Sequence, residues 1–174
     1  MGHEGMKSSL ISREVIADSA ELTVRGHCYD ALVGIAGCDK SSPGLMMSMV
    51  RFNVPSVFIY GGSILPGKYK GNDVTVVDVF EAVGKYSTGQ MSAAELRKLE
   101  LVACPSAGAC GGQFTANTMA CVSEAIGFAL PYSAGTPAPY EERDKYAKAS
   151  GKTCLLYTSP SPRDATLSRM PSSA

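Results

Sequence analysis

The stretch Ala31-Leu-Val-Gly-Ile-Ala-Gly-Cys-Asp-Lys40 decides the fold of this 174-residue chain. Its first six residues form a short aliphatic run followed by glycine, which is typical of a buried strand in a parallel sheet. We expect the next helix to start at Ser42-Pro43, with proline at the first helical position. Cys38, Asp39 and Lys40 therefore lie in the predicted turn after a strand, at the sheet edge where open α/β sheets place their ligands.

A second short apolar run, Pro55–Tyr60, ends at Gly61-Gly62 and predicts another strand. The order strand, helix, strand is one βαβ unit, whose crossover should be right-handed. Helices are expected at residues 12–26, 43–53, 74–86, 92–103, 115–126 and 140–150, with a loop at 62–72. Ser12 and Thr115 are the predicted N-caps of two of them, and Ser92 and Glu95 form a capping-box pattern at the start of another. The sequence therefore predicts an α/β fold, a parallel sheet flanked by helices, in a domain that covers residues 1–150.

Composition narrows the possible partners and compartments. Sixteen basic residues balance sixteen acidic residues, so the net charge does not indicate nucleic acid or an anionic membrane as a partner. No apolar run is long enough to span a bilayer, and the chain does not start with a secretory signal pattern. We expect a cytoplasmic protein whose six cysteines are reduced thiols.

Both ends of the chain are unusual. The glycines in Met1–Met6 are typical of the interior of a loop, and we expect the true N-terminus to lie upstream. The stretch Cys154–Asp164 has no amphipathic period and resembles a translated sequencing adapter. We therefore predict that residues 154–174 are a non-native read-through tail. The alternative is a genuine Ser/Pro-rich disordered tail.

Cys38 and Cys110 each lie in a glycine-flanked loop before a predicted helix. If both loops reach the same sheet edge, the two thiolates can share one inorganic centre. The spacing of the two cysteines is not a C-x-x-C array, so the spacing alone is weak evidence for a shared metal site. The alternative is that both are small buried thiols. Asp39 could serve a neighbouring magnesium ion, since carboxylate oxygen suits magnesium while thiolate suits iron. Lys40 could be a neutral, carbamylated ligand, but chemistry alone favours an ion pair with Asp39.

Five stretches carry a resemblance to a known family: Met1–Lys7, Ser12–Asp18, Gly37–Lys40 with Pro43-Gly44, Tyr60–Gly62 and Ala103–Met119. They resemble the dihydroxy-acid dehydratases, which form one iron–sulfur family with the phosphogluconate and sugar-acid dehydratases. The resemblance runs in order through residues 1–150 and implies part of an N-terminal cluster-binding domain.

The resemblance implies an iron–sulfur cluster, [2Fe–2S] or [4Fe–4S], with Cys38 and Cys110 as two of its three ligands. Asp39 and carbamylated Lys40 would be magnesium ligands. Cys104 matches a motif cysteine that does not bind the cluster, and Cys28 and Cys121 are expected to be packing residues.

The parent enzyme implied by the resemblance is a hydro-lyase, and we expect this fragment alone to be inactive. It would convert 2,3-dihydroxy-3-methyl carboxylates to 2-oxo acids in valine, leucine and isoleucine biosynthesis, as a homodimer. The third cysteine and one magnesium aspartate would lie upstream, and the base in a C-terminal domain, so no catalytic base is expected here. The alternatives are a sugar-acid or phosphogluconate dehydratase and a non-catalytic iron–sulfur module.

Overall fold

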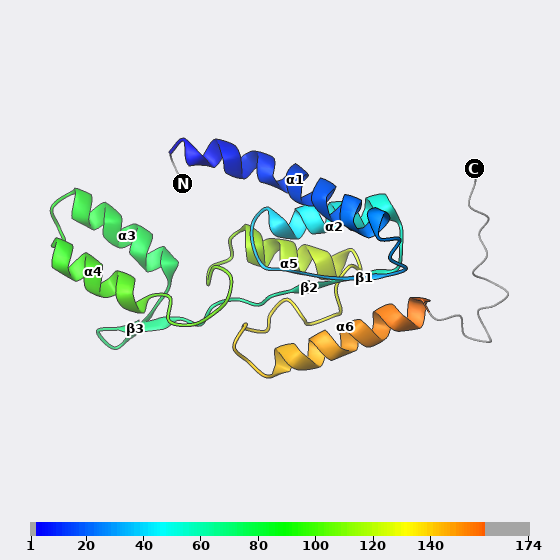
Figure 1. Cartoon of the computed structure of the whole chain (residues 1–174). Coiled ribbons are helices and arrows are strands. Elements are labelled where there is room, and N and C mark those ends of the chain that lie inside the picture. The colour runs from blue at the N-terminus through cyan, green and yellow to red at the C-terminus, as the bar shows by residue number, and fades with distance from the viewer. Residues whose placement is uncertain (1–2, 159–174) are drawn as a thin grey trace.

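The computed structural model describes residues 3–158 and has an α/β architecture (Figure 1). In chain order its elements are α1 (Gly5–Gly26), β1 (Leu32–Ala36), α2 (Ser41–Phe52), β2 (Ser56–Tyr60), β3 (Gly67–Tyr69), β4 (Asn72–Val74), α3 (Val76–Ser87), α4 (Ala93–Val102), α5 (Thr115–Ala125) and α6 (Glu142–Thr158). None of the helices between residues 3 and 158 is long and apolar enough to cross a membrane.

The predicted βαβ unit is present. Strands β1 and β2 pair in parallel, in a register that runs from Leu32 opposite Ser56 to Ala36 opposite Tyr60. Helix α2 connects them and ends at Asn53, whose left-handed backbone (φ 54°) closes the last turn. The predicted α/β class with a parallel sheet and flanking helices is therefore confirmed.

Helices cover both faces of this small sheet. Phe58 and Tyr60 of β2 pack into one buried core with Met46 and Met49 of α2 and with alanines of α5. The alternate β2 residues, Val57 and Ile59, are also buried, and α6 lies along the opposite side of the sheet in Figure 1. Because side chains alternate along a strand, β2 is buried on both faces, as its unbroken apolar run indicates.

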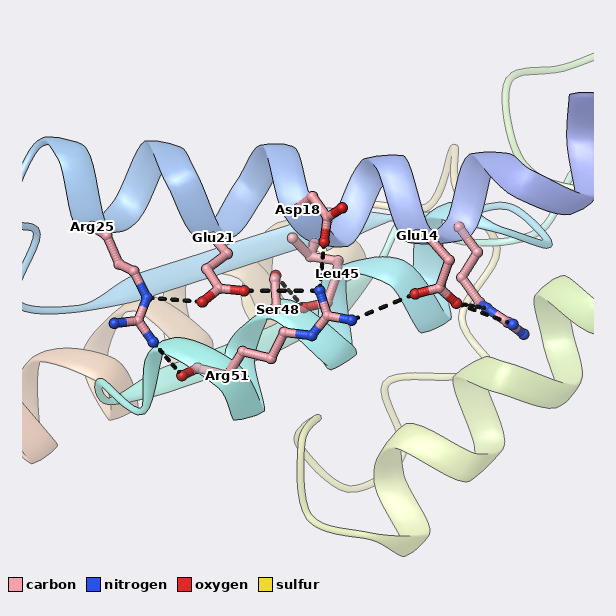
Figure 2. A network of polar contacts seen from close by, with 8 residues as sticks. Glu14, Asp18, Glu21, Arg25, Leu45, Ser48 and Arg51 are labelled. Carbon is pink, nitrogen blue, oxygen red and sulfur yellow. Dashed lines mark hydrogen bonds and ion pairs between the residues drawn. The ribbon is translucent and has the colours of Figure 1, made fainter.

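Helix α1 packs on α2 through close backbone contact and a network of charges (Figure 2). A Cβ added at Gly44 would lie 2.8 Å from the Arg13 carbonyl oxygen, so glycine allows the close approach. Arg51 of α2 donates to Asp18 Oδ1 at 2.7 Å and to Glu14 Oε2 at 3.4 Å. These ion pairs are partly exposed, so each contributes only up to about 1 kcal/mol and mainly aligns the two helices.

A second, smaller core joins α3 and α4 to a hairpin that the sequence did not predict. Strands β3 and β4 pair antiparallel where the sequence predicted the end of a loop (62–72) and, at residue 74, the start of a helix. Both turn residues, Lys70 (φ 50°) and Gly71 (φ 85°), have positive φ, as a type I′ hairpin turn requires. Three-residue strands are too short to show a hydrophobic period, and for that reason the hairpin was missed.

The starts of several helices differ from the predictions; α3 begins at Val76 instead of residue 74, and α6 at Glu142 instead of residue 140. Helix α1 begins at Gly5, and Ser12, the predicted N-cap, lies inside it with its hydroxyl donating to the Ser9 carbonyl at 2.6 Å. Helix α2 begins at Ser41, which makes Pro43 its third residue, still within the first turn where no N–H is needed. Phe114, and not Thr115, is the N-cap of α5.

Helix α6 continues to Thr158, beyond its predicted end at residue 150. Cys154 is buried, and its thiol donates weakly to the carbonyls of Leu32 and Pro55 at 3.6 and 3.7 Å. Part of the predicted read-through segment thus belongs to a helix that packs on the sheet. Residues 159–174 lie outside the described residues, and the origin of the segment stays a prediction.

Candidate metal centre

The loops that carry Cys38 and Cys110 meet at the carboxyl ends of β1 and β2. Gly61 N donates to the Ala36 carbonyl at 2.8 Å, which holds the two strand ends together. Ala109 N donates to the Gly62 carbonyl at 2.8 Å, and Ile64 N donates to the Ala109 carbonyl at 2.8 Å. These two hydrogen bonds form an isolated parallel β-bridge between Ser63 and Ala109, just beyond the end of β2. It places Cys110 next to the turn that follows β1.

Glycine is required where these loops approach each other. Gly62 has φ +95°, and a Cβ there would lie 2.5 Å from the Ala138 nitrogen. Gly108 has φ +138°, and a Cβ there would lie 2.4 Å from the Ile64 nitrogen. Both the backbone conformation and the space exclude a side chain. Gly62 and Gly108 therefore serve the close packing of the loop after β2 against the loop that carries Cys110.

Local hydrogen bonds brace each cysteine loop. Ser41 Oγ accepts from the Cys38 nitrogen at 3.2 Å and donates to the Cys38 carbonyl at 3.3 Å. When the Asn117 amide is oriented to suit its neighbours, its nitrogen donates to the carbonyls of Cys110 (2.8 Å) and Gly112 (2.5 Å). The backbone on both sides is thus held by polar side chains from α2 and α5, while both thiols stay exposed.

Cys38 and Cys110 line the same two cavities. One has a volume of ≈ 560 Å³ and is also lined by Asp39, Phe80 and Phe114. The other, of ≈ 540 Å³, is lined mainly by the backbones of the glycine-rich loops. The structure therefore brings together Cys38, Asp39 and Cys110, which the sequence analysis singled out.

Lys40 forms an ion pair with its neighbour. Its Nζ lies 3.2 Å from Asp39 Oδ2, and its side chain is 19% exposed against 40% for Asp39. This is the arrangement that chemistry alone favoured. In it the amine is a charged donor, so Lys40 would have to leave the pair before it could be carbamylated and bind a metal.

The donor set fits an iron–sulfur cluster in part. Two accessible thiols from separate loops suit iron, and the adjacent carboxylate suits magnesium. Within residues 3–158 no three His, Cys, Asp or Glu side chains gather closely enough to hold a metal ion by themselves. If Cys38 and Cys110 bind an iron–sulfur cluster, they therefore need at least one further ligand.

Among the described residues, no other cysteine and no histidine lines either cavity. Cys104 and Cys121 are exposed, as is Cys28, so the expectation that Cys28 and Cys121 are packing residues was wrong. Cys28 has a left-handed backbone (φ 53°) after α1, at a turn where its side chain cannot enter the core. His27 stacks on Tyr29 at the surface, with ring centroids 5.2 Å apart.

Sequence reasoning missed one polar residue near the centre. Tyr60, at the end of β2, is fully buried, and its hydroxyl has no hydrogen-bond partner among residues 3–158. Burial raises its pKa to about 12; the nearby Cys110, Cys38 and Cys121 add to this rise, while Arg143 opposes it. A tyrosine that ends an otherwise apolar strand, directly before Gly61-Gly62, was the available signal.

Comparison with known proteins identifies the family. Residues 1–169 match the family described as dihydroxy-acid/6-phosphogluconate dehydratase, N-terminal. The chain belongs to this dehydratase family. Its match covers the two cysteine loops and runs past Cys154.

Relatives within the family include proteins named dihydroxy-acid dehydratase from three distant organisms. The protein from Pelagibacter ubique is 87% identical over 166 residues, which are 94% of this chain and 29% of the relative. The one from Parvibaculum lavamentivorans is 76% identical over 166 residues, again 94% and 29%. The one from Metallosphaera sedula is 56% identical over 155 residues, 89% of this chain and 28% of the relative. The chain thus spans less than a third of the length of these relatives.

Proposed function

We propose that this chain is the N-terminal part of a dihydroxy-acid dehydratase. The parent protein would convert 2,3-dihydroxy-3-methyl carboxylates to 2-oxo acids in branched-chain amino acid biosynthesis, as a cytoplasmic homodimer. Membership of the dehydratase family and the shared name of the similar proteins support this proposal. The small-molecule substrate would enter at the edge of the sheet where Cys38 and Cys110 lie.

Within this assignment Cys38 and Cys110 are two ligands of an iron–sulfur cluster, and Asp39 is a magnesium ligand. Lys40 is a second magnesium ligand in its carbamylated form. When bound, the two metal centres supply Lewis acidity for the loss of the 3-hydroxyl group and for the acidity of the hydrogen at carbon 2. The observation that carries the proposal is that both cysteines and Asp39 line one cavity.

The residues of this chain hold and orient the reacting groups. The thiols of Cys38 and Cys110 lose their protons when they bind iron, as metal-bound cysteine must. Asp39 offers a hard oxygen beside them, and the bonds from Ser41 keep its turn in place. We assign the base that removes the hydrogen from carbon 2 to the part of the parent protein that this chain does not span.

The experiment uses a full-length protein, made by replacing the matching segment of the Pelagibacter ubique relative with this chain. The purified protein is reconstituted without oxygen in iron, sulfide and magnesium, and assayed with 2,3-dihydroxyisovalerate and with gluconate. Formation of the branched 2-oxo acid supports the proposal. Turnover of gluconate alone would move the protein to the sugar-acid branch. A loaded cluster without turnover of either compound would favour the non-catalytic iron–sulfur module.

A further inference from the structure

Tyr60 is buried, and its hydroxyl makes no hydrogen bond to any group in residues 3–158. Its side chain is 0% exposed, and it is the largest of the fully buried side chains. Its hydroxyl oxygen has no hydrogen-bond partner. A buried hydroxyl without a partner is unfavourable, and native proteins rarely retain one without a reason. A phenylalanine would pack equally well at this position. The buried hydroxyl of Tyr60 therefore indicates an acceptor that lies outside the described residues.

The position of Tyr60 indicates where that acceptor lies. Tyr60 pairs with Ala36, two residues before Cys38. Two residues after Tyr60, the Gly62 carbonyl accepts from Ala109, the neighbour of Cys110. Tyr60 therefore lies within two residues of the backbone contacts that join it to both cysteine loops. Burial, and then the nearby Cys110, raise its pKa to about 12, so the hydroxyl keeps its proton at neutral pH and can act as a hydrogen-bond donor.

A buried cation lies over the Tyr60 ring. The Arg143 guanidinium carbon is 5.9 Å from the ring centroid, and the residue is only 9% exposed. Its Nη1 donates to the carbonyls of Ser133 at 2.5 Å and Thr136 at 3.5 Å, but its Nη2 has no partner among residues 3–158.

Arg143 also has no counter-ion in the described part of the chain. None of the ion pairs found there includes it. A buried positive charge without a partner is costly and calls for a negative group nearby. An iron–sulfur cluster held by cysteine thiolates is such a group. The charge of Arg143 also favours release of the Tyr60 proton, which makes the hydroxyl a stronger donor.

We propose that Tyr60 donates a hydrogen bond to a sulfur atom of the iron–sulfur group at Cys38 and Cys110, and that Arg143 strengthens this bond. The inference rests on the proposed function, because it requires that group to be present. Tyr60 is then a positioning residue that acts on the metal centre and not on the substrate. Hydrogen bonds to cluster sulfurs raise the reduction potential, because they stabilise the added negative charge of the reduced state.

The test compares Tyr60→Phe with Tyr132→Phe in the reconstituted full-length protein described above. Phenylalanine keeps the buried ring of residue 60 and removes only its hydroxyl. Tyr132 is a matched control, because its side chain is 83% exposed. Iron and sulfide are quantified, and the midpoint potential of the cluster is measured by redox titration followed by electron paramagnetic resonance. We expect full cluster loading in both variants and a more negative potential in Tyr60→Phe alone.

The results for Tyr60→Phe distinguish this proposal from its alternatives. An unchanged potential in a fully loaded Tyr60→Phe protein would overturn it, and would mean that water satisfies the hydroxyl. A folded Tyr60→Phe protein that binds less iron would also overturn it, because the hydroxyl would then be needed for binding. If the parent protein itself binds no iron, the proposed function fails, which differs visibly from a loaded cluster with an unaltered potential.

A second variant tests the part played by Arg143. Arg143→Gln removes the charge and leaves Tyr60 in place, so we expect a smaller negative shift of the potential. In the double variant with Tyr60→Phe, the Arg143 substitution should shift the potential by less than it does alone, because part of its effect passes through the tyrosine hydroxyl. Fully additive shifts would show that Arg143 acts on the cluster independently of Tyr60.

Discussion

The Nζ atom of Lys40 lies 3.2 Å from Oδ2 of Asp39, so the two neighbouring residues assigned to magnesium hold each other. An ammonium cannot bind a cation, and a carboxylate that accepts from Lys40 has fewer lone pairs free for a metal. Conversion of Lys40 to a carbamate would reverse its charge and break the pair. The same two side chains could then face one magnesium ion together. Under the proposed function, the ion pair is the arrangement before the metal binds.

If Lys40 is a magnesium ligand as proposed, it should carry a carbamate in the magnesium-loaded parent protein. After incubation with ¹³C-labelled bicarbonate and magnesium, the wild-type protein should show a carbamate signal in its ¹³C NMR spectrum. Lys40→Arg should lack the signal, because arginine keeps its charge. A spectrum without a carbamate in the active wild-type protein would leave Lys40 as the ion-pair partner of Asp39.

Asp39→Asn should weaken magnesium binding, because it replaces a charged oxygen ligand with a neutral one. We expect the magnesium concentration for half-maximal activity to rise at least about 10-fold, with the cluster content unchanged. Asp30→Asn, an exposed carboxylate before β1, is the control. Equal magnesium dependence in all three proteins would remove Asp39 from the metal site.

Cys38→Ser and Cys110→Ser should each prevent stable cluster loading in the full-length protein, since each removes a soft ligand from an already incomplete set. Iron and sulfide analysis after anaerobic reconstitution measures this directly. Cys28→Ser provides the control, because Cys28 is exposed and lies in the turn after α1. Full iron content in both single variants would contradict the ligand assignment.

Gly62→Ala should destabilise the junction of the cysteine loops and reduce cluster loading. The new Cβ would lie 2.5 Å from the Ala138 nitrogen at a residue with φ +95°. Gly71 is a matched control, with φ +85° and open space around it. Gly71→Ala should therefore cost only the conformational penalty of about 1 kcal/mol, and Gly62→Ala clearly more. Urea unfolding and iron content together test this, and equal losses in the two variants would argue against close packing of the loops.

Stability should fall at high pH because of Tyr60. Burial raises its pKa from 10.0 to about 12 in the folded protein, so the native state keeps a proton that the unfolded chain releases. Between pH 10 and 12 the unfolded state binds fewer protons, and the free energy of unfolding drops as pH rises, by up to about 3 kcal/mol. Tyr60→Phe should show a shallower loss than wild type in urea unfolding across this window. Parallel curves for the two proteins would contradict the raised pKa.

Local patterns account for what the sequence predicted correctly. The aliphatic runs ending at Ala36 and Tyr60 form parallel strands, because an unbroken apolar run suits a strand buried on both faces. The capping box from Ser92 to Glu95 starts α4 where expected, since its hydrogen bonds join residues only three apart. The start of α1 was misplaced, because Ser12 resembles a cap but its hydroxyl bonds within the helix.

The sequence by itself determined the βαβ unit, most of the helices and the place of Cys38, Asp39 and Cys110 at the ends of their elements. Those features depend on apolar period, caps and glycines within a few residues of one another. Only the tertiary structure decided that Ala109 bonds to Gly62 and that Tyr60 is buried beside Arg143. These contacts depend on how segments distant in the chain pack, and burial and electrostatic interaction acquire their values only once that packing is formed.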